Sequence, residues 1–180
     1  MARLKYSRNA QCLRHSILTL KPPKSCVFDA MAQGPTPQIA WLGLGNIGRG
    51  MCTNLVSKGN LSQPLIIYNR TQQRAEDLSA KLGPGKTKVA SSIEEAVKSA
   101  ELIFMCLGDD ASVKDTIEIA LAISGGVRGK LFCDCSTVHP DTTNDVAQRI
   151  TGEGAQFVAC PGKSSPQDRH SKANLTLHFI

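Results

Sequence analysis

The sequence predicts an α/β fold with a doubly wound parallel sheet, and three observations lead to that class. From residue 38 to about residue 160, short apolar runs alternate with amphipathic helical segments, as expected for parallel strands joined by covering helices. The apolar runs are nearly continuous, which is typical of strands buried on both faces. A glycine-rich turn over residues 43–48 follows the first run, where the first helix begins. The chain has 180 residues, which suits one globular domain.

Six segments are predicted to be strands. They are residues 38–42, 65–68, 88–90, 102–107, 131–135 and 156–159. Residues 38–42 are too apolar for a strand with one solvated face, and residues 102–107 form the most apolar stretch of the chain. Doubly wound sheets that bind dinucleotides commonly have the strand order 3-2-1-4-5-6, so we expect that order here.

The first two of five predicted helices carry an apolar stripe and end near a glycine. The stripe of the first helix consists of Ile47, Met51 and Leu55. Gly59 follows it, at the position where helices often end with a residue in the left-handed conformation. The stripe of the second helix consists of Ala75, Leu78 and Leu82, and Gly83 follows it. Both segments are therefore expected to be amphipathic helices.

Polar residues and a proline mark the starts of the other three helices. Ser92 is followed three residues later by Glu95, which predicts a capping box. The inward positions of this short helix are Ile93, Ala96, Val97 and Ala100. Asp110 is expected to cap the next helix, which stops by the glycines at 125–126. Its apolar positions are Val113, Ile117 and Leu121. Pro140 suits the first turn of the last helix.

The glycine-rich turn is the strongest functional signal. It reads Gly43-Leu44-Gly45-Asn46-Ile47-Gly48, a GxGxxG at a strand-to-helix junction. In dinucleotide-binding domains of the Rossmann type, the first glycine permits the tight turn, the second lets a pyrophosphate approach the backbone, and the third allows close packing of helix on strand. The N–H groups and partial positive charge of the helix start would bind the phosphates. A glycine-rich turn of purely structural purpose is the alternative.

The residues after the second strand bear on the choice of cofactor. NAD enzymes commonly have an acidic residue there, which accepts hydrogen bonds from the ribose 2′-hydroxyl. This chain has Asn69-Arg70-Thr71, starting 21 residues after Gly48. A guanidinium can bind a 2′-phosphate and stack on adenine, and Asn69 and Thr71 could add neutral donors. NADP(H) is therefore favoured and NAD(H) remains open, as does the alternative that Arg70 is a solvated residue at a helix start.

Four motifs in order carry a family resemblance. They are residues 43–51 with Asn54-Leu55, Tyr68-Asn69-Arg70-Thr71, Leu107-Gly108-Asp109-Asp110, and Asp134-Cys135-Ser136-Thr137 with Pro140. On these motifs, residues 38–161 resemble the β-hydroxyacid dehydrogenases. That family includes 3-hydroxyisobutyrate dehydrogenase, 6-phosphogluconate dehydrogenase, glyoxylate and succinic semialdehyde reductases, and the related imine reductases.

The resemblance implies roles for residues after the fourth and fifth strands. Leu107 and Gly108 would line the nicotinamide side of the cofactor, although the family usually has proline where Gly108 stands. Thr137 would lie at the nicotinamide ribose and Ser136 at the substrate. Both segments follow carboxyl ends of strands beside the expected switch-point crevice, where ligands bind in open α/β sheets. The structural alternative is that Ser136 and Thr137 cap the helix that begins near Pro140.

The resemblance ends at Pro161. In the family, the sixth strand leads into a substrate loop and then an all-helical domain, which supplies a catalytic Lys with an Asn one helical turn later and commonly forms the dimer. Only 19 residues follow Pro161, without the loop's paired glycines, and Lys172 with Asn174 has the wrong spacing. Hydride transfer to a carbonyl needs a proton donor near the oxygen. No catalytic residue is therefore assigned, and the chain is interpreted as a C-terminally truncated NAD(P)-binding domain.

Two functions stay open. The first is the cofactor domain of an NADP(H)-dependent oxidoreductase of small hydroxy or oxo acids, completed by a separate helical domain or in a homodimer. The second is a non-catalytic NADP-binding module, or truncated pseudoenzyme. The seven cysteines form no pair or cluster with structural-zinc spacing, so no metal site is expected and most thiols are interpreted as buried in a reducing compartment. No apolar run approaches the roughly 20 residues that cross a bilayer.

The net charge of +6 lies in the flanks. Residues 1–30 contain six basic residues and one acidic residue, whereas residues 31–161 contain 12 basic and 13 acidic residues. The charge therefore gives no argument for nucleic acid binding. Residues 1–37 are expected to form a flexible extension and residues 162–180 an irregular tail around a domain at 38–161. Residues 1–30 resemble a mitochondrial presequence, while Met31 would suit the start of a cytoplasmic protein, so both compartments stay open.

Overall fold

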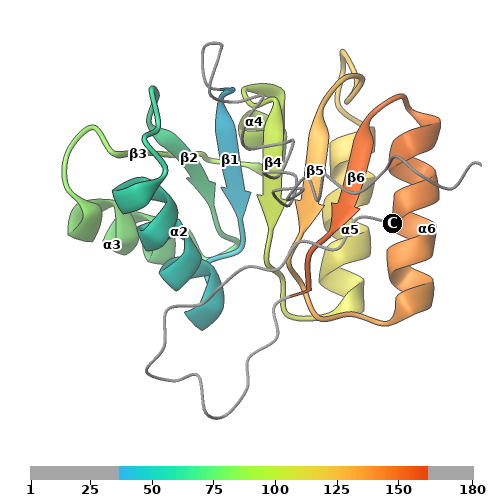
Figure 1. Ribbon diagram of the computed structural model, residues 1–180, viewed down its shortest axis with the longest axis horizontal. Coiled ribbons are helices and arrows are strands. Elements are labelled where there is room, and N and C mark those ends of the chain that lie inside the picture. The colour runs from blue at the N-terminus through green and yellow to red at the C-terminus, as the bar shows by residue number, and fades with distance from the viewer. Residues whose placement is uncertain (1–36, 162–180) are drawn as a thin grey trace, which may run out of the picture. The chain divides into compact units, whose positions relative to one another are not determined.

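A six-stranded parallel sheet organises the part of the chain that the computed structural model describes, residues 37–161 (Figure 1). Its strands are β1 (Ile39–Leu42), β2 (Leu65–Tyr68), β3 (Thr87–Val89), β4 (Leu102–Met105), β5 (Leu131–Asp134) and β6 (Gln156–Ala159). They lie in the order β3-β2-β1-β4-β5-β6, and every neighbouring pair is parallel. The predicted doubly wound α/β class and strand order are confirmed. Apart from Pro37, the predicted extension and tail lie outside the described residues.

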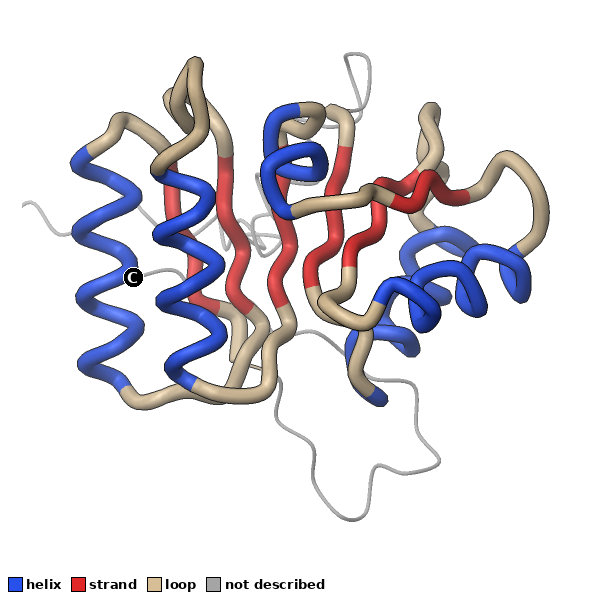
Figure 2. The backbone as a smooth tube through the Cα atoms, turned by 180° about the vertical axis from the view of Figure 1, so that it is seen from behind, coloured by secondary structure: helices blue, strands red, loops and turns tan. Residues whose placement is uncertain are grey.

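Five helices connect these strands. They are α2 (Asn46–Lys58), α3 (Gln72–Leu82), α4 (Ile93–Lys98), α5 (Asp110–Leu121) and α6 (Pro140–Gly152). Helices α4, α5 and α6 cover the face of the sheet that is turned to the viewer in Figure 2, and α2 lies on the opposite face with α3 beside it. None of the helices between residues 37 and 161 is long and apolar enough to cross a membrane.

Helices cover both faces of the sheet, which explains why the strands are continuous apolar runs in the sequence. In β1, Ala40 and Leu42 belong to the core beneath α4, α5 and α6, whereas Trp41 points to the other face and is equally buried. Trp41 lies beside Phe104 of β4 in the strand register, and their rings stack with centroids 5.2 Å apart. Because neither face of β1 meets water, apolar side chains stabilise the strand at every position.

Two expectations about α2 are wrong in detail. Its buried residues are Gly48 and Cys52, whereas Ile47, the first residue of the predicted apolar stripe, is 53% exposed. Gly59 ends the helix with an ordinary right-handed φ of −80°, and the left-handed residue is Asn60, with a φ of 48°. Glycine fits at position 59 for a steric reason, because a Cβ there would lie 2.4 Å from the Leu55 carbonyl oxygen.

The start of α5 also differs from the prediction by one residue. Asp109, and not Asp110, is the N-cap, and its carboxylate accepts a hydrogen bond of 2.7 Å from the Ser112 N–H. The Asp110 carboxylate instead accepts one of 3.0 Å from the backbone N–H of His139. Asp110 therefore connects α5 to the start of α6, while its neighbour caps α5.

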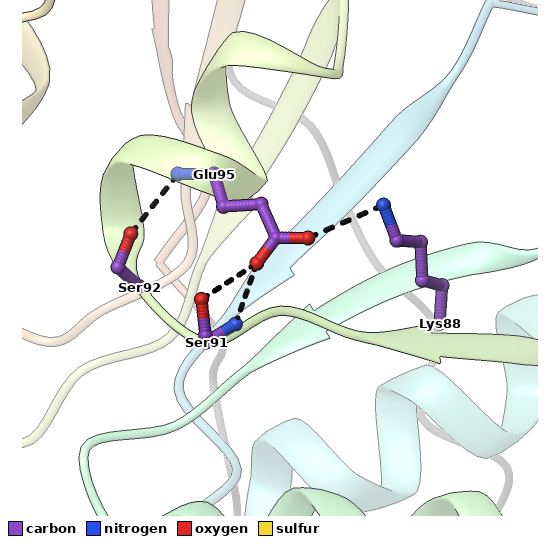
Figure 3. A network of polar contacts seen from close by, with 4 residues as sticks. All are labelled: Lys88, Ser91, Ser92 and Glu95. Atoms are coloured by element: carbon purple, nitrogen blue, oxygen red, sulfur yellow. Dashed lines mark hydrogen bonds and ion pairs between the residues drawn. The ribbon is translucent and has the colours of Figure 1, made fainter.

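The start of α4 contains a polar network at the edge of the sheet (Figure 3). Ser92 caps the helix as predicted, accepting a hydrogen bond from the Glu95 N–H. The Glu95 carboxylate accepts 2.8 Å hydrogen bonds from the backbone N–H and the hydroxyl of Ser91, and it lies 3.2 Å from the Lys88 ammonium. The carboxylate therefore binds one residue earlier than a standard capping box requires. These hydrogen bonds and Lys88 lower the pKa of Glu95 to about 2.

The Glu95→Gln variant is expected to lose stability at neutral pH and much less in acid. The pKa of Glu95 is lower in the folded chain than in the unfolded chain, so its stabilisation is present above the ordinary glutamate pKa and is lost as the pH falls towards 2. Because the side chain is partly exposed, the loss at pH 7 should be about 1 kcal/mol or less, or about 2–4 °C in melting temperature. Melting curves at pH 7 and pH 3 measure it. The control is Glu118→Gln on the exposed side of α5. A loss for Glu95→Gln that did not depend on pH would contradict the stabilising role of the ionised Glu95 carboxylate.

Candidate functional site

The glycine-rich turn after β1 packs against the segment that follows β4. Gly43 donates its N–H to the Tyr68 carbonyl over 3.0 Å and has a φ of +97°, which favours glycine. A Cβ at Gly43 would lie 2.3 Å from the Cys106 carbonyl oxygen and 2.9 Å from the Leu107 side chain. The first glycine therefore allows two central segments to meet at the point where the strand order reverses.

Gly48 fulfils a packing requirement in the same turn. The Trp41 indole donates a buried hydrogen bond of 2.9 Å to the Gly43 carbonyl oxygen. A Cβ at Gly48 would lie 2.2 Å from that oxygen and 3.2 Å from the indole nitrogen. Gly48 is buried and thus lets α2 pack directly on this bonded pair. The first and third glycines of the motif therefore have structural reasons within the chain.

For Gly45, in contrast, no contact within the described part of the chain requires glycine. It is exposed, its φ is −67°, and a Cβ there would meet no heavy atom within 4 Å. Gly45 is the N-cap of α2, whose start has no side-chain cap and no acidic residue in its first turn. Asn46 and Ile47, the next two residues, are exposed as well. The start of α2 therefore presents exposed backbone N–H groups and a partial positive charge, an arrangement that suits an anionic ligand.

The end of β2 is joined to the glycine-rich turn by Asn69. The Asn69 side-chain oxygen accepts a hydrogen bond of 2.9 Å from the Leu44 N–H, and its amide nitrogen donates one of 3.0 Å to the Thr71 carbonyl. Leu44 is buried, whereas Arg70 and Thr71 are exposed, and Thr71 is the N-cap of α3. The exposed polar groups next to the turn are thus a guanidinium and a hydroxyl, with no carboxylate in the Asn69-Arg70-Thr71 segment.

The segment after β4 contributes a half-buried Leu107 and an exposed Gly108. It also contains Asp109, a charged residue that the sequence analysis did not assign to the site. Hydrogen bonds from Ser112 lower the pKa of Asp109, and the Arg70 guanidinium lowers it further. Arg70 follows β2 and Asp109 follows β4, so the two residues come from the strands on either side of β1. The side chains of both residues are exposed.

The segment after β5 is built on a buried carboxylate. The Ser136 hydroxyl oxygen accepts a hydrogen bond of 2.9 Å from the Leu107 N–H, and the Ser136 N–H donates one of 2.9 Å to Asp134. Asp134 is 3% exposed, and burial raises the pKa of its carboxyl although the Ser136 hydrogen bonds oppose the shift. An acidic residue at the end of an apolar strand is the sequence signal that could have identified this support.

The suggestion that Ser136 and Thr137 cap α6 is wrong. The N-cap is His139, whose ring nitrogen Nδ1 accepts a hydrogen bond from the Asp141 N–H over 3.3 Å. Thr137 is exposed and is separated from the glycine-rich turn by β4, whereas Ser136 is buried. All predicted site residues nevertheless lie beyond the carboxyl ends of four neighbouring strands, β2, β1, β4 and β5.

Cysteine thiols also line this edge of the sheet. Cys106 follows β4 and Cys135 follows β5. Burial and the Asp134 carboxylate raise the pKa of the Cys106 thiol, and burial with neighbouring thiols raises that of Cys135 to about 12. Both stay protonated at neutral pH, so neither is suited to act as a nucleophile. Within residues 37–161, no group of three or more His, Cys, Asp or Glu side chains is arranged to hold a metal ion.

The order of the strands and the glycine-rich turn at the reversal point define a dinucleotide-binding domain of the Rossmann type. Residues 38–173 match the family of the NAD binding domain of 6-phosphogluconate dehydrogenase. The chain belongs to that family and is an NAD(P)-binding domain.

Two curated relatives illustrate the range of this family. The NADH-dependent oxidoreductase ucdB of Aspergillus ustus is 39% identical over 120 residues, which cover 67% of this chain and 41% of the relative. The cytokine-like nuclear factor N-PAC of Homo sapiens is 30% identical over 131 residues, which cover 72% of this chain and 22% of the relative. The chain thus spans less than half the length of either relative.

Two solved structures have the same fold. The 3-hydroxyisobutyrate dehydrogenase of Mycobacterium tuberculosis with L-serine is 26% identical, with a TM-score of 0.63 over 72% of this chain and 41% of that chain. A reductive aminase of Aspergillus terreus in complex with NADPH and ethyl-5-oxohexanoate is 23% identical, with a TM-score of 0.62 over 73% of this chain and 42% of that chain. The similarity to the aminase concerns the fold alone.

Proposed function

We propose that this chain binds NADP(H) across the carboxyl ends of β1 and β4. The observation that carries the proposal is Gly45, an exposed residue for which the chain itself gives no steric or conformational reason to be glycine. The N–H groups at Gly45, Asn46 and Ile47 would bind the pyrophosphate at the start of α2. The exposed Ile47 side chain lies at the same helix start, where it could cover apolar parts of the cofactor.

The remaining site residues divide the dinucleotide between them. We propose that Arg70 and Thr71 receive the 2′-phosphate at the adenosine end. Leu107 and Gly108 would line the nicotinamide, and Thr137 its ribose. The resemblance gives the neighbouring Ser136 to the substrate. The bound nicotinamide would supply the hydride, while the chain orients and holds it.

The preference for NADP(H) over NAD(H) is the part of the proposal that depends on Arg70. It is supported by the segment Asn69-Arg70-Thr71, which offers a cation to a 2′-phosphate and no carboxylate that would repel it. The relative from Aspergillus ustus is named an NADH-dependent enzyme, and the aminase structure, which has the same fold, contains NADPH, so these similarities do not decide between the two cofactors. Titration of this chain with NADPH and with NADH measures the preference directly.

The Arg70→Ala variant is expected to weaken NADPH binding about tenfold and NADH binding by less than about twofold, because only NADPH carries the 2′-phosphate. Titrations followed by nicotinamide fluorescence measure both dissociation constants. Lys114→Ala removes an exposed positive charge from α5 and is the control. Equal affinity of the unmodified chain for NADH and NADPH would refute the proposed preference.

We propose further that the domain belongs to an oxidoreductase of small hydroxy or oxo acids, active when a helical domain or a second copy completes the pocket. Support comes from the similarity to 3-hydroxyisobutyrate dehydrogenase. Purified chain is mixed with NADPH and a panel of semialdehydes, and NADPH binding and oxidation are measured separately. Turnover would favour an active enzyme in this form.

A non-catalytic NADP-binding module is the second candidate. It is favoured by the relatives that are named as nuclear factors and not as enzymes. Binding of NADPH without turnover would favour it. For the compartment we propose the mitochondrial matrix or the cytoplasm, and fusion of residues 1–30 to a fluorescent reporter distinguishes these two alternatives.

A further inference from the structure

Two side chains connect the loops of the proposed cofactor site to the outer strands. The Leu44 N–H, after β1, donates to the Asn69 side-chain oxygen, after β2, over 2.9 Å. The Leu107 N–H, after β4, donates to the Ser136 hydroxyl oxygen, after β5, also over 2.9 Å. β1 and β4 are the central strands, at which the strand order reverses, and β2 and β5 are their outer neighbours. Each central loop is thus held by one polar side chain from outside.

Both side chains are committed to protein groups. Asn69 also donates its amide to the Thr71 carbonyl over 3.0 Å. Ser136 is 5% exposed, and its hydroxyl and N–H both hydrogen-bond the buried Asp134 carboxylate. A ligand that used the Asn69 oxygen or the Ser136 hydroxyl would have to compete with these hydrogen bonds. A buried backbone N–H that lost its acceptor would carry a desolvation cost.

The two hydrogen bonds set the positions of groups that face the ligand. Leu44 is followed directly by Gly45, at the open start of α2, and Leu107 is followed by the exposed Gly108. Leu107 also lies close to Gly43, since a Cβ on Gly43 would be 2.9 Å from the Leu107 side chain. A shift of either loop would therefore move the pyrophosphate end and the nicotinamide end of the proposed site together.

We propose that Asn69 and Ser136 are positioning residues, which hold the two central loops in the geometry that binds a dinucleotide, and that neither is a direct ligand of cofactor or substrate. The proposal rests on the proposed cofactor function and deepens it. It assigns Asn69 a role different from that of its neighbour Arg70. Arg70 recognises the 2′-phosphate, whereas Asn69 acts on the loop that receives the pyrophosphate common to NADH and NADPH.

The test measures the dissociation constants of the full chain for NADH and NADPH, together with its melting temperature. Asn69→Ala and Ser136→Ala are each expected to weaken both dinucleotides by the same factor, about five- to tenfold, so that the ratio of the two affinities stays as in the unmodified chain. Arg70→Ala is the matched comparison, because it changes that ratio. Asn144→Ala on α6 and Ser124→Ala after α5 are exposed controls that leave both affinities unchanged.

Three results would overturn the proposal. A loss confined to NADPH in Asn69→Ala would make Asn69 a ligand of the 2′-phosphate. Unchanged cofactor affinity in Ser136→Ala would show that Ser136 does not position the Leu107 loop for the cofactor. Binding of substrate would then be the remaining role for Ser136. A lower melting temperature with unchanged affinity, measured well below the melting transition, would make either residue merely structural. If the unmodified chain bound neither dinucleotide, the proposed cofactor function itself would fail. That outcome is distinguishable from the other three, because they require that the unmodified chain binds.

Discussion

The Gly45→Asp variant is expected to lose NADPH and NADH binding by at least about 100-fold while its melting temperature is unchanged or slightly raised. The new carboxylate would occupy the open space at the start of α2, where the proposed pyrophosphate lies, and like charges brought together there cost several kcal/mol. The fold should tolerate the change, because the φ of −67° is ordinary and aspartate is a better N-cap than glycine by a few tenths of a kcal/mol. Nicotinamide fluorescence titrations and melting curves measure the two effects.

The control for Gly45→Asp is Asn54→Asp. It adds the same charge to the same helix, two turns farther along, at an exposed residue whose side-chain oxygen already accepts a hydrogen bond from Lys58. Its affinity for both dinucleotides should stay within about twofold of the unmodified chain, because exposed charges about a Debye length apart are largely screened. Retained binding by Gly45→Asp would refute a pyrophosphate site at this helix start, and the proposed function with it.

The strands and helices were predictable because burial on both faces leaves a direct trace in the sequence. Residues such as Ala40 and Trp41 point to opposite faces of β1 and are both apolar. The strand order followed from the alternation of strands and helices together with the glycine-rich turn, which indicates the common topology of dinucleotide-binding sheets. These are regularities of layered α/β folds, and one sequence is enough to show them.

Details at helix ends were less predictable because tertiary contacts decide them. Asp109 and Asp110 are equally good caps by residue type, and the bond from His139 to Asp110 comes from a segment 29 residues away. At the end of α2, the close approach of the Leu55 carbonyl places glycine at position 59, while Asn60 takes the left-handed conformation. The stripe of Ile47, Met51 and Leu55 had the right period, but Gly48 and Cys52 form the buried face.

The sequence was enough to predict which segments form the candidate site, but not the role of each residue within it. Carboxyl ends of parallel strands meet at one edge, so motifs after four strands had to converge. The hydrogen bonds of Asn69 and Ser136 reach 25 and 29 residues along the chain, and residue type alone does not distinguish a ligand-binding amide or hydroxyl from one that supports a loop.

Gly48→Ala is expected to destabilise the domain by about 3 kcal/mol or more, against the trend of helix propensity. In an exposed helix interior, replacing glycine by alanine stabilises by about 1 kcal/mol. At Gly48, however, the added Cβ would lie 2.2 Å from the Gly43 carbonyl oxygen, a backbone atom that the Trp41 indole holds by a buried hydrogen bond. Either α2 must move away from β1 or the Trp41 bond must break, and both costs exceed the gain in propensity.

Gly50→Ala provides the matched control two residues later in α2. Gly50 is exposed, and a Cβ there would meet no heavy atom within 4 Å, so this variant should gain up to about 1 kcal/mol from helix propensity alone. Urea unfolding of both variants, followed by Trp41 fluorescence, compares the free energies of unfolding directly. If Gly48→Ala were as stable as Gly50→Ala, the close packing of α2 on the Gly43 carbonyl would be wrong. Opposite signs for two identical substitutions in one helix would instead show that the third glycine of the motif is required by packing and not by the helix.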